Sequence, residues 1–291
     1  MPLTILGASA VIFYVIRQIP GDPVVIMLGI HATGANYEQL AHALGLDQPI
    51  FVQYFFYIWR VFMGDWGASI YGHEPVLPYV LARFAATLAL TTVSLVFSAL
   101  IGISLGIFAA MRQGSIVDHI CRILSLSFFS VPLFWSGSLF ILIFSVYLHI
   151  LPSMGRSMVL PAATLALWAC GPISRIARAS VLDVENQDFV RIARGKGISY
   201  RRLWINHILR NAFVPIITVI GSQFGMLIGG AAITEAVFSY PGVGLLIIDG
   251  IFMRDYPVVQ GAVLFLSIFV CMTNFLSDVS YALLDPRITF G

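Results

Sequence analysis

Few side chains in this sequence could do acid–base, nucleophilic or metal chemistry together. The six histidines never recur at the i, i+4 spacing that places two metal ligands on one face of a helix. Cys121, Cys170 and Cys271 each lie within an apolar run, form no close pair and have no zinc-ligand spacing. We therefore interpret the cysteines as small buried hydrophobic residues, and we expect neither a catalytic residue nor a metal site.

The single lysine argues against nucleotide chemistry. A phosphate-binding P-loop needs a lysine followed by serine or threonine after a glycine-rich turn, because these groups contact the phosphates and Mg²⁺. Lys196 is the only lysine, and Gly197 follows it. We therefore expect that the chain does not hydrolyse ATP and binds no cofactor.

One charged segment predicts a short, two-faced helix. Phe189, Ile192 and Ala193 recur at i, i+3 and i+4, which places them on one helix face. The helix dipole favours acidic residues at the start and basic residues at the end, and the segment supplies both: Asp183, Glu185 and Asp188, then Arg191, Arg194 and Lys196. Gly195 and Gly197 can end the helix. From these residues alone, such a helix either docks on a partner or rests on anionic lipid headgroups.

The elements that position this helix must lie in a membrane. Apolar residues make up 59% of the 291 residues and charged residues only 10%, with a mean hydropathy of +0.91, whereas soluble domains carry about 25% charged residues. A soluble fold of this size could not bury so much apolar surface. The net charge of +2 is too small to indicate nucleic-acid binding.

Six stretches approach the ~20 apolar residues that a spanning helix needs. They are Leu3–Ile19, Arg83–Met111, Ile120–Leu148, Met158–Ser174, Asn211–Thr234 and Tyr256–Leu284. We therefore predict an all-α membrane protein with about six transmembrane helices in one domain, residues 1–291. The first stretch is expected to be a retained anchor, since no basic residues precede it.

The distribution of basic residues predicts that both termini are cytoplasmic. The inner segments then hold Arg112, Arg122, Arg175, Arg178, Arg191, Arg194, Lys196, Arg201, Arg202, Arg210 and Arg287, against Arg17, Arg60, Arg83, Arg156 and Arg254 outside. The segment 20–82 is then extracytoplasmic, and its aromatic stretch 51–63 predicts an interfacial helix. The segment 175–210 is a cytosolic loop that contains the charged helix.

This loop resembles the EAA loop of ABC-importer permeases, in the version of the dipeptide, oligopeptide, glutathione and nickel family. Residues 188–197 read DFVRIARGKG, and HILRNA at 207–212 and Pro215 follow. Further motifs of this family recur in order along nearly the whole chain: IPGDP at 19–23, LGLDQP at 44–49, GDWGAS at 64–69, YPGVG at 240–244, RDYPVVQ at 254–260 and LDPRI at 284–288. Arg191 replaces the glutamate of the wider motif, as is usual for the peptide branch.

The resemblance implies a type I importer permease in a bacterial inner membrane. Its partners would be a second permease, two cytosolic ATPase subunits that hold ATP and Mg²⁺, and an extracytoplasmic solute-binding protein. The loop helix would dock into a groove on the ATPase through Asp188, Phe189, Ile192, Ala193, Arg194, Gly195, Lys196 and Gly197. Small peptides are the expected solute. The short connection between residues 148 and 158 resembles nickel and glutathione members, so these substrates stay open.

Two further sets of polar or kinked positions are candidates for transport roles. Candidate residues of the translocation path are Pro132, Trp135, Gln223 and Asn274, because polar groups and prolines within spans often mark a path. Candidate contacts for the binding protein are Asp22, Asp65, Arg254 and Asp255. Alternatively, Pro132 is a packing kink and the second set caps local structure.

Two other classes of membrane protein are less well supported by the sequence. An ion-coupled secondary transporter predicts ionisable residues at the bilayer midplane or inverted repeats. An intramembrane enzyme predicts a cluster of His, Asp or Cys residues within the spans. Neither pattern is evident in this sequence.

Overall fold

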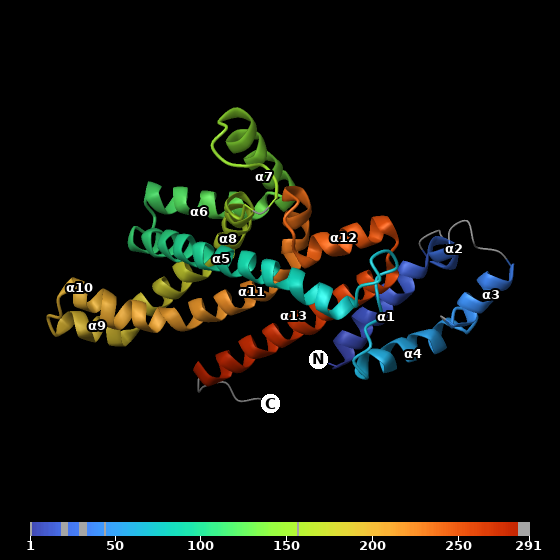
Figure 1. Ribbon diagram of the computed structural model, residues 1–291. Coiled ribbons are helices and arrows are strands. Elements are labelled where there is room, and N and C mark those ends of the chain that lie inside the picture. Colours follow the sequence, from blue (N-terminus) through green and yellow to red (C-terminus); the bar gives the residue numbers. More distant parts are fainter. Residues whose placement is uncertain (1, 19–22, 29–33, 44, 156, 285–291) are drawn as a thin grey trace. The chain divides into compact units, whose positions relative to one another are not determined.

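The computed structural model describes residues 2–18, 23–28, 34–43, 45–155 and 157–284, which are almost entirely helical (Figure 1). The helices are α1 (Pro2–Gln18), α2 (Pro23–Leu28), α3 (Gly34–Ala43), α4 (Ile50–Phe62), α5 (Val76–Met111), α6 (Ile116–Ser130), α7 (Leu133–Phe140), α8 (Val159–Glu185), α9 (Asp188–Gly195), α10 (Tyr200–Arg202), α11 (Arg210–Phe238), α12 (Val243–Met253) and α13 (Tyr256–Leu284), with π-helical segments η2 (Ile141–Tyr147) and η3 (Leu203–Leu209). One isolated antiparallel bridge joins Ala68 and Pro75.

The chain forms two compact units. Unit 1 contains residues 1–87 and 241–271, and unit 2 contains residues 88–240 and 272–291. The boundaries fall within α5 and α13, so both of these long helices contribute to both units. The predicted cytosolic helix belongs to unit 2, and the predicted interfacial helix belongs to unit 1.

Four helices in the described residues are long and apolar enough to cross a membrane: α5, α8, the continuous helix 200–238 and α13. A fifth span results if the bent pair α6 and α7 with η2 crosses once. α1 is apolar but has only 17 residues, slightly fewer than the ~20 that span a bilayer. The predicted all-α membrane fold is confirmed, although several spans extend beyond their predicted ends.

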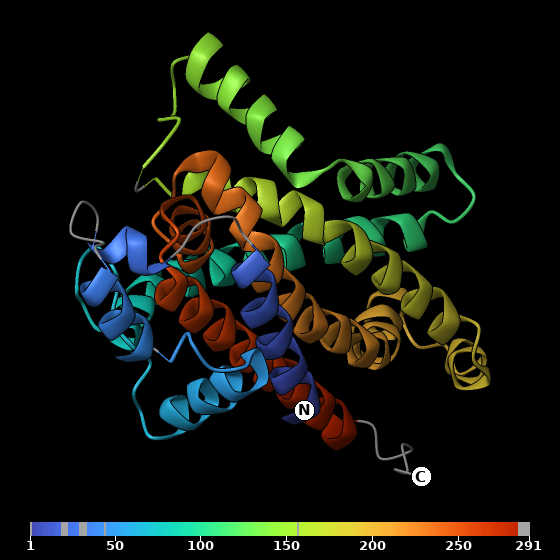
Figure 2. The same cartoon turned by 90° about the vertical axis from the view of Figure 1, so that its right-hand side faces the viewer.

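The predicted third span is broken at Pro132. α6 ends before Val131, which is extended (φ −79°, ψ 129°), and α7 begins after Pro132. Proline has no amide hydrogen to donate and disfavours a helical conformation in the residue before it. The two halves consequently meet at 101°, and Figure 2 shows the sharp bend between the two green helices.

Small residues allow the helices of unit 2 to pack closely around α8. A Cβ atom added to Gly106 of α5 would lie 2.5 Å from the carbonyl oxygen of Ser174 and 2.6 Å from Ala177 Cβ. A Cβ atom added to Gly171 of α8 would lie 2.6 Å from the carbonyl oxygen of Ser125 in α6. Backbones approach this closely only where side chains are absent, which is typical of membrane helices.

The predicted interfacial helix is confirmed as a helix, α4, within one residue of its predicted ends. Its aromatic side chains are largely exposed, including Phe51, Phe55, Phe56, Trp59 and Phe62. On the side facing α1, the Tyr54 ring packs edge-on against Phe13 at 5.3 Å, and the Tyr54 hydroxyl is 2.7 Å from Ser9 Oγ. α4 is therefore attached to α1 on one side and presents aromatic rings on the other.

Candidate functional site

The predicted cytosolic helix forms as α9, between the end of α8 and the start of α10. Gln187 is extended (φ −74°, ψ 149°), and its carbonyl oxygen accepts the first hydrogen bond of the helix from Val190 N at 3.1 Å. Asp188 lies in the first turn and Arg194 in the last, where the helix dipole favours each charge. Figure 1 shows α9 at one end of α8 and α11.

The apolar residues of α9 divide between a buried face and an exposed one. Val190 (0% exposed) and Ala193 (7%) point inward, whereas Phe189 (36%) and Ile192 (59%) are exposed. Of the three residues predicted to share one helix face, Phe189 and Ile192 are thus exposed, whereas Ala193 lies at the buried edge of that face. All four residues are apolar on a helix of two turns, so the sequence alone could not show which pair packs inward.

The inward face of α9 packs in a buried group that we call the α9 cluster. Its members are Ala110, Val181, Val184, Val190, Ala193, Leu203, Trp204, Ile208 and Ala212. They come from the ends of α5 and α8, from α9 itself, and from η3 and the start of α11. Because close-packed interiors transmit displacement, a force on α9 would reach all of these helices.

Two ion pairs lie at the surface of α9. Arg194 Nη2 donates to Glu185 Oε1 at 2.5 Å and joins α9 to the last residue of α8. Arg191 Nη1 lies 3.9 Å from Asp188 Oδ1, and both side chains are largely exposed. The first pair limits how α9 can turn relative to α8, whereas exposed pairs like the second contribute little to stability.

Gly197 ends the helical segment in a conformation that favours glycine. Its φ is +75°, in the left-handed region, and its amide donates to the Arg194 carbonyl at 3.0 Å. No atom lies within 4 Å of the position that a Cβ atom would take on Gly197 or on Gly195. The requirement for glycine at 197 therefore comes from the backbone angle and not from a crowded neighbour.

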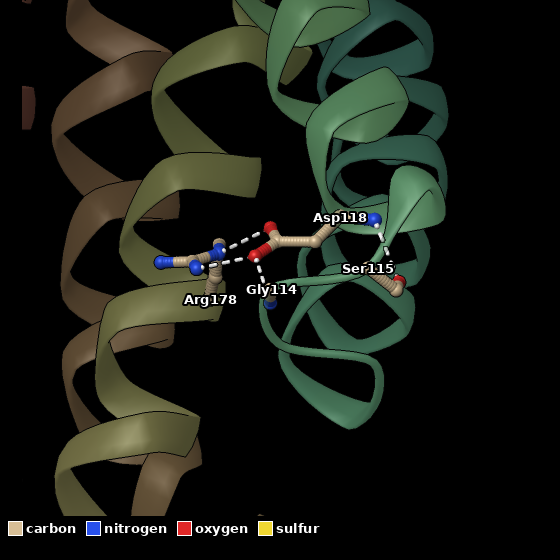
Figure 3. A network of polar contacts seen from close by, with 4 residues as sticks. All are labelled: Gly114, Ser115, Asp118 and Arg178. Atoms are coloured by element: carbon tan, nitrogen blue, oxygen red, sulfur yellow. Dashed lines mark hydrogen bonds and ion pairs between the residues drawn. The ribbon is translucent and has the colours of Figure 1, made fainter.

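A buried ion pair that the sequence analysis missed holds α6 against α8 (Figure 3). Arg178 donates to Asp118 through Nε (2.8 Å, to Oδ1) and Nη2 (2.7 Å, to Oδ2), and Asp118 is 1% exposed. The Gly114 amide also donates to Asp118 Oδ2, at 3.0 Å. The available signal was the S-x-x-D spacing of Ser115 and Asp118, which is typical of a helix start.

The four candidate path residues lie on three helices, α7, α11 and α13. Pro132 and Trp135 lie at the start of α7 and are exposed. Gln223 in α11 is 4% exposed, and among the described residues its Oε1 atom has no hydrogen-bond partner. Asn274 in α13 lies against α11, with Oδ1 directly beside the position that a Cβ atom on Gly225 would take. Gln223 and Asn274 are thus near the same turn of α11, and α7 supplies the other two.

The four candidate contacts for a binding protein differ in exposure. Asp22 lies outside the described residues, and Arg254 is exposed. Asp65 is half exposed, and the donors Arg60 and Gly67 N hold the pKa of its carboxyl below the ordinary value.

Asp255, the fourth candidate, has no surface to offer a partner. It is 5% exposed, and it accepts hydrogen bonds from Ser69 Oγ at 2.5 Å and Ile70 N at 3.2 Å. These bonds hold the loop between α4 and α5 against the start of α13. Asp255 therefore positions a loop within its own unit.

Comparison with known protein families decides the class of the chain. Residues 102–290 match the family described as "Binding-protein-dependent transport system inner membrane component", and residues 2–91 match its N-terminal companion family. The chain belongs to this family of ABC-importer permeases. The predicted family is confirmed, and the permease is an inner-membrane component of a transport system that works with a binding protein and an ATPase.

Named relatives resemble the permease along nearly its whole length. The dipeptide transport system permease protein DppB of Escherichia coli is 38% identical, covering 98% of this chain and 95% of the relative. The di/tripeptide transport system permease protein DppB of Pseudomonas aeruginosa is 36% identical with the same coverage. The glutathione transport system permease protein GsiC of Escherichia coli is 37% identical, covering 99% of this chain and 95% of GsiC.

Solved structures resemble the permease in fold. The MetNI methionine ABC transporter, in an inward-facing conformation, matches with a TM-score of 0.64 and 20% identity, covering 73% of this chain and 99% of that chain. An amino acid ABC transporter matches with a TM-score of 0.57 and 16% identity, covering 70% and 93%. These likenesses confirm the fold of a type I importer permease.

Proposed function

We propose that the permease forms, with a second permease, the path through which small peptides enter the cell. The supporting observation is the 36–38% identity to permeases of dipeptide and di/tripeptide transport over 98% of the chain. Sequence similarity over the full length includes the path helices as well as the coupling loop. A peptide is also compatible with the polar side chains near α11, since Gln223 offers a buried acceptor and Asn274 a nearby amide.

Glutathione is a second candidate solute. The glutathione permease GsiC is 37% identical over 99% of this chain, which is within the range of the peptide permeases. Glutathione is itself a tripeptide, so the same path chemistry would serve both solutes. The binding protein, which delivers the solute, would then decide between them.

Transport would be driven by a separate ATPase that docks on α9. Two exposed apolar side chains, Phe189 and Ile192, project from this helix beside the exposed Arg191, and such apolar side chains are typical anchors of a protein interface. The α9 cluster would carry ATPase closure to the ends of α5, α8 and α11. The complete importer would contain two permeases, two ATPase subunits that hold ATP and Mg²⁺, and a binding protein. This chain would bind no cofactor and perform no catalysis.

This arrangement requires α9 to be cytosolic, and we propose that both termini are cytosolic as well. The excess of basic residues in the segments that include α9 and the loop before α6 supports this orientation. α4, with its exposed aromatic rings, would then lie at the outer surface of the membrane.

Uptake in cells tests the proposed solute and the energy source together. The chain is expressed with its operon partners in bacteria that lack their own dipeptide, glutathione and nickel permeases. Labelled dialanine, glutathione and a nickel chelate are then supplied separately. Dialanine uptake that requires the ATPase genes would support the proposal. Uptake of glutathione alone or nickel alone would show that this compound, and not a dipeptide, is the solute. Uptake without the ATPase genes would contradict the importer mechanism.

A further inference from the structure

A cavity of about 250 Å³ lies between α6 and α8 in unit 2. Ala109 and Ala179 are among its lining residues. Their close neighbours in sequence, Ala110 and Val181, belong to the α9 cluster. The cavity therefore adjoins the buried group that anchors the proposed coupling helix, although it shares no residue with that cluster.

The polar wall of this cavity is strongly basic. Arg122 of α6 and Arg175 and Arg178 of α8 line it, and no carboxylate does. Two nitrogens of Arg178 bind Asp118, and Figure 3 shows its third nitrogen pointing away from that carboxylate. Among the described residues, neither Arg122 nor Arg175 takes part in a salt bridge. With Asp118 counted against the three arginines, the site keeps two uncompensated positive charges.

Ser125 and Ser174, which hydrogen-bond to each other at 2.9 Å, also line the cavity, and the rest of its wall is apolar. Leu126 (53% exposed) and Phe129 (39%) of α6 line it beside Pro172 of α8. The site thus combines guanidinium groups at one end with an apolar surface that continues along the outside of α6. A phospholipid has the same arrangement, because its anionic headgroup is attached to acyl chains.

We propose that this cavity binds the phosphate headgroup of an anionic phospholipid, with an acyl chain along Leu126 and Phe129. Basic pockets between transmembrane helices on the cytoplasmic side are typical sites for doubly charged headgroups such as that of cardiolipin. Arginine suits phosphate because its planar group donates two parallel hydrogen bonds. The volume is close to the lower end of small-ligand pockets, about 300 Å³, which fits a headgroup better than a peptide.

This inference uses the proposed orientation, in which the ends of α6 and α8 near α9 lie at the cytoplasmic leaflet. It places a lipid beside the helices that α9 moves, so the leaflet composition would affect coupling between ATPase and permease. Lipid binding is measured independently of transport. Its result therefore does not depend on whether the proposed solute is correct.

Native mass spectrometry of the purified importer tests the site. The wild-type complex and the variants Arg122→Gln, Arg175→Gln and the double variant are titrated with cardiolipin, with phosphatidylcholine and with inorganic phosphate. Each arginine should contribute about five-fold to cardiolipin affinity, with a larger loss in the double variant. Phosphatidylcholine should bind equally to all forms. Arg201→Gln, an exposed arginine of α10 outside the cavity, is the matched control and should bind cardiolipin like the wild type.

Three results would overturn the proposal. The first is equal cardiolipin binding by the wild type and the double variant. The second is displacement of cardiolipin by inorganic phosphate at millimolar concentration, which would indicate a site for free phosphate. The third is loss of the second permease from the double variant, which would show that a protein surface covers the cavity. The melting temperature of each variant is measured in parallel. It should stay unchanged, because Arg178, the partner of Asp118, is intact in all of them.

Discussion

Asp118 and Arg178 show how a charged pair can lie within packed membrane helices. The carboxylate is almost fully buried, and three donors satisfy it: two guanidinium nitrogens and the Gly114 amide. Buried charges are tolerated only when they are paired and hydrogen-bonded. The pair therefore fixes the start of α6 against the last third of α8, next to the basic cavity.

Replacing Asp118 by asparagine should destabilise the permease. The change removes one charge of the pair and leaves the Arg178 guanidinium with a weaker acceptor. Since Arg178 is partly exposed (23% of its side chain), we expect a loss of about 2 kcal/mol, below the 3–5 kcal/mol of fully buried pairs. The melting temperature of the variant in detergent measures this loss of stability. Asp65→Asn breaks a half-exposed pair with Arg60. The stability of this variant should lie within about 0.5 kcal/mol of the wild type.

Gly197 should tolerate only residues that adopt a positive φ. Gly197→Ala places a Cβ atom at φ +75°, which costs about 1–2 kcal/mol and should shift the turn after α9. Gly197→Asn should keep more activity, because asparagine adopts this conformation more readily. Gly195→Ala has equally open space and a negative φ, so it is the matched control. We expect uptake rates to fall in the order wild type, Gly195→Ala, Gly197→Asn, Gly197→Ala. Equal loss of uptake in all three variants would show that the positive φ at position 197 does not decide the effect.

At the scale of the helix, α9 has one buried face and one exposed apolar face. Val190 and Ala193 hold it in the α9 cluster, and Phe189 and Ile192 remain exposed. An apolar residue left in water on a charged loop suggests that a partner covers it. The two faces can therefore be tested by substitutions on one short helix.

Substitution of both exposed residues by alanine should separate binding from stability. The variant Phe189→Ala with Ile192→Ala should melt like the wild type, because surface changes are usually neutral. Its recovery of the ATPase should fall about a hundred-fold, since each of the two large apolar side chains contributes roughly 1.5 kcal/mol when buried, or about ten-fold in affinity. Val190→Ala is the counterpart and should lower stability by about 2 kcal/mol through a cavity. Unchanged ATPase recovery in the double variant would show that this face is not the docking surface.

Helix contacts in unit 2 depend on glycines at specific positions. Gly106→Ala would place a Cβ atom 2.5 Å from the Ser174 carbonyl oxygen, and the backbone of α8 would have to move, at about 1–3 kcal/mol. Gly229→Ala in α11 meets no atom within 4 Å and should be neutral or stabilising, because alanine favours helix. Melting temperatures of the two purified variants check this contrast. Similar melting of both would mean that α5 and α8 do not pack as described.

For the whole molecule, much of the fold could be predicted from the sequence. Apolar runs located the long helices, and the aromatic stretch located α4 within one residue of its ends. Charge placement and the glycines at 195 and 197 predicted α9, which begins at Asp188, one of the acidic residues expected to precede the helix. These features are local, since they depend on composition, spacing and backbone preference within a few turns.

The features that could not be predicted depend on distant contacts. α8 continues past the predicted end at Ser174 to Glu185, and in this extension Arg178 donates to Asp118, sixty residues earlier in the chain. Asp255 is buried because Ser69 and Ile70 come from a loop far away in sequence. A hydropathy profile assigns such charged residues to the surface, because it carries no information about their partners in the fold.

The exposed face of α9 is the surface where we propose that the ATPase binds. A photo-crosslinking amino acid is placed at Ile192, and separately at Phe252 of α12, which is 82% exposed. The assembled importer is irradiated in its native membrane, and the crosslinked partners are identified. We predict a crosslink from position 192 to the ATPase subunit and none from position 252. If the ATPase co-purifies but crosslinks only from position 252, or from neither position, the exposed face of α9 is not its binding site.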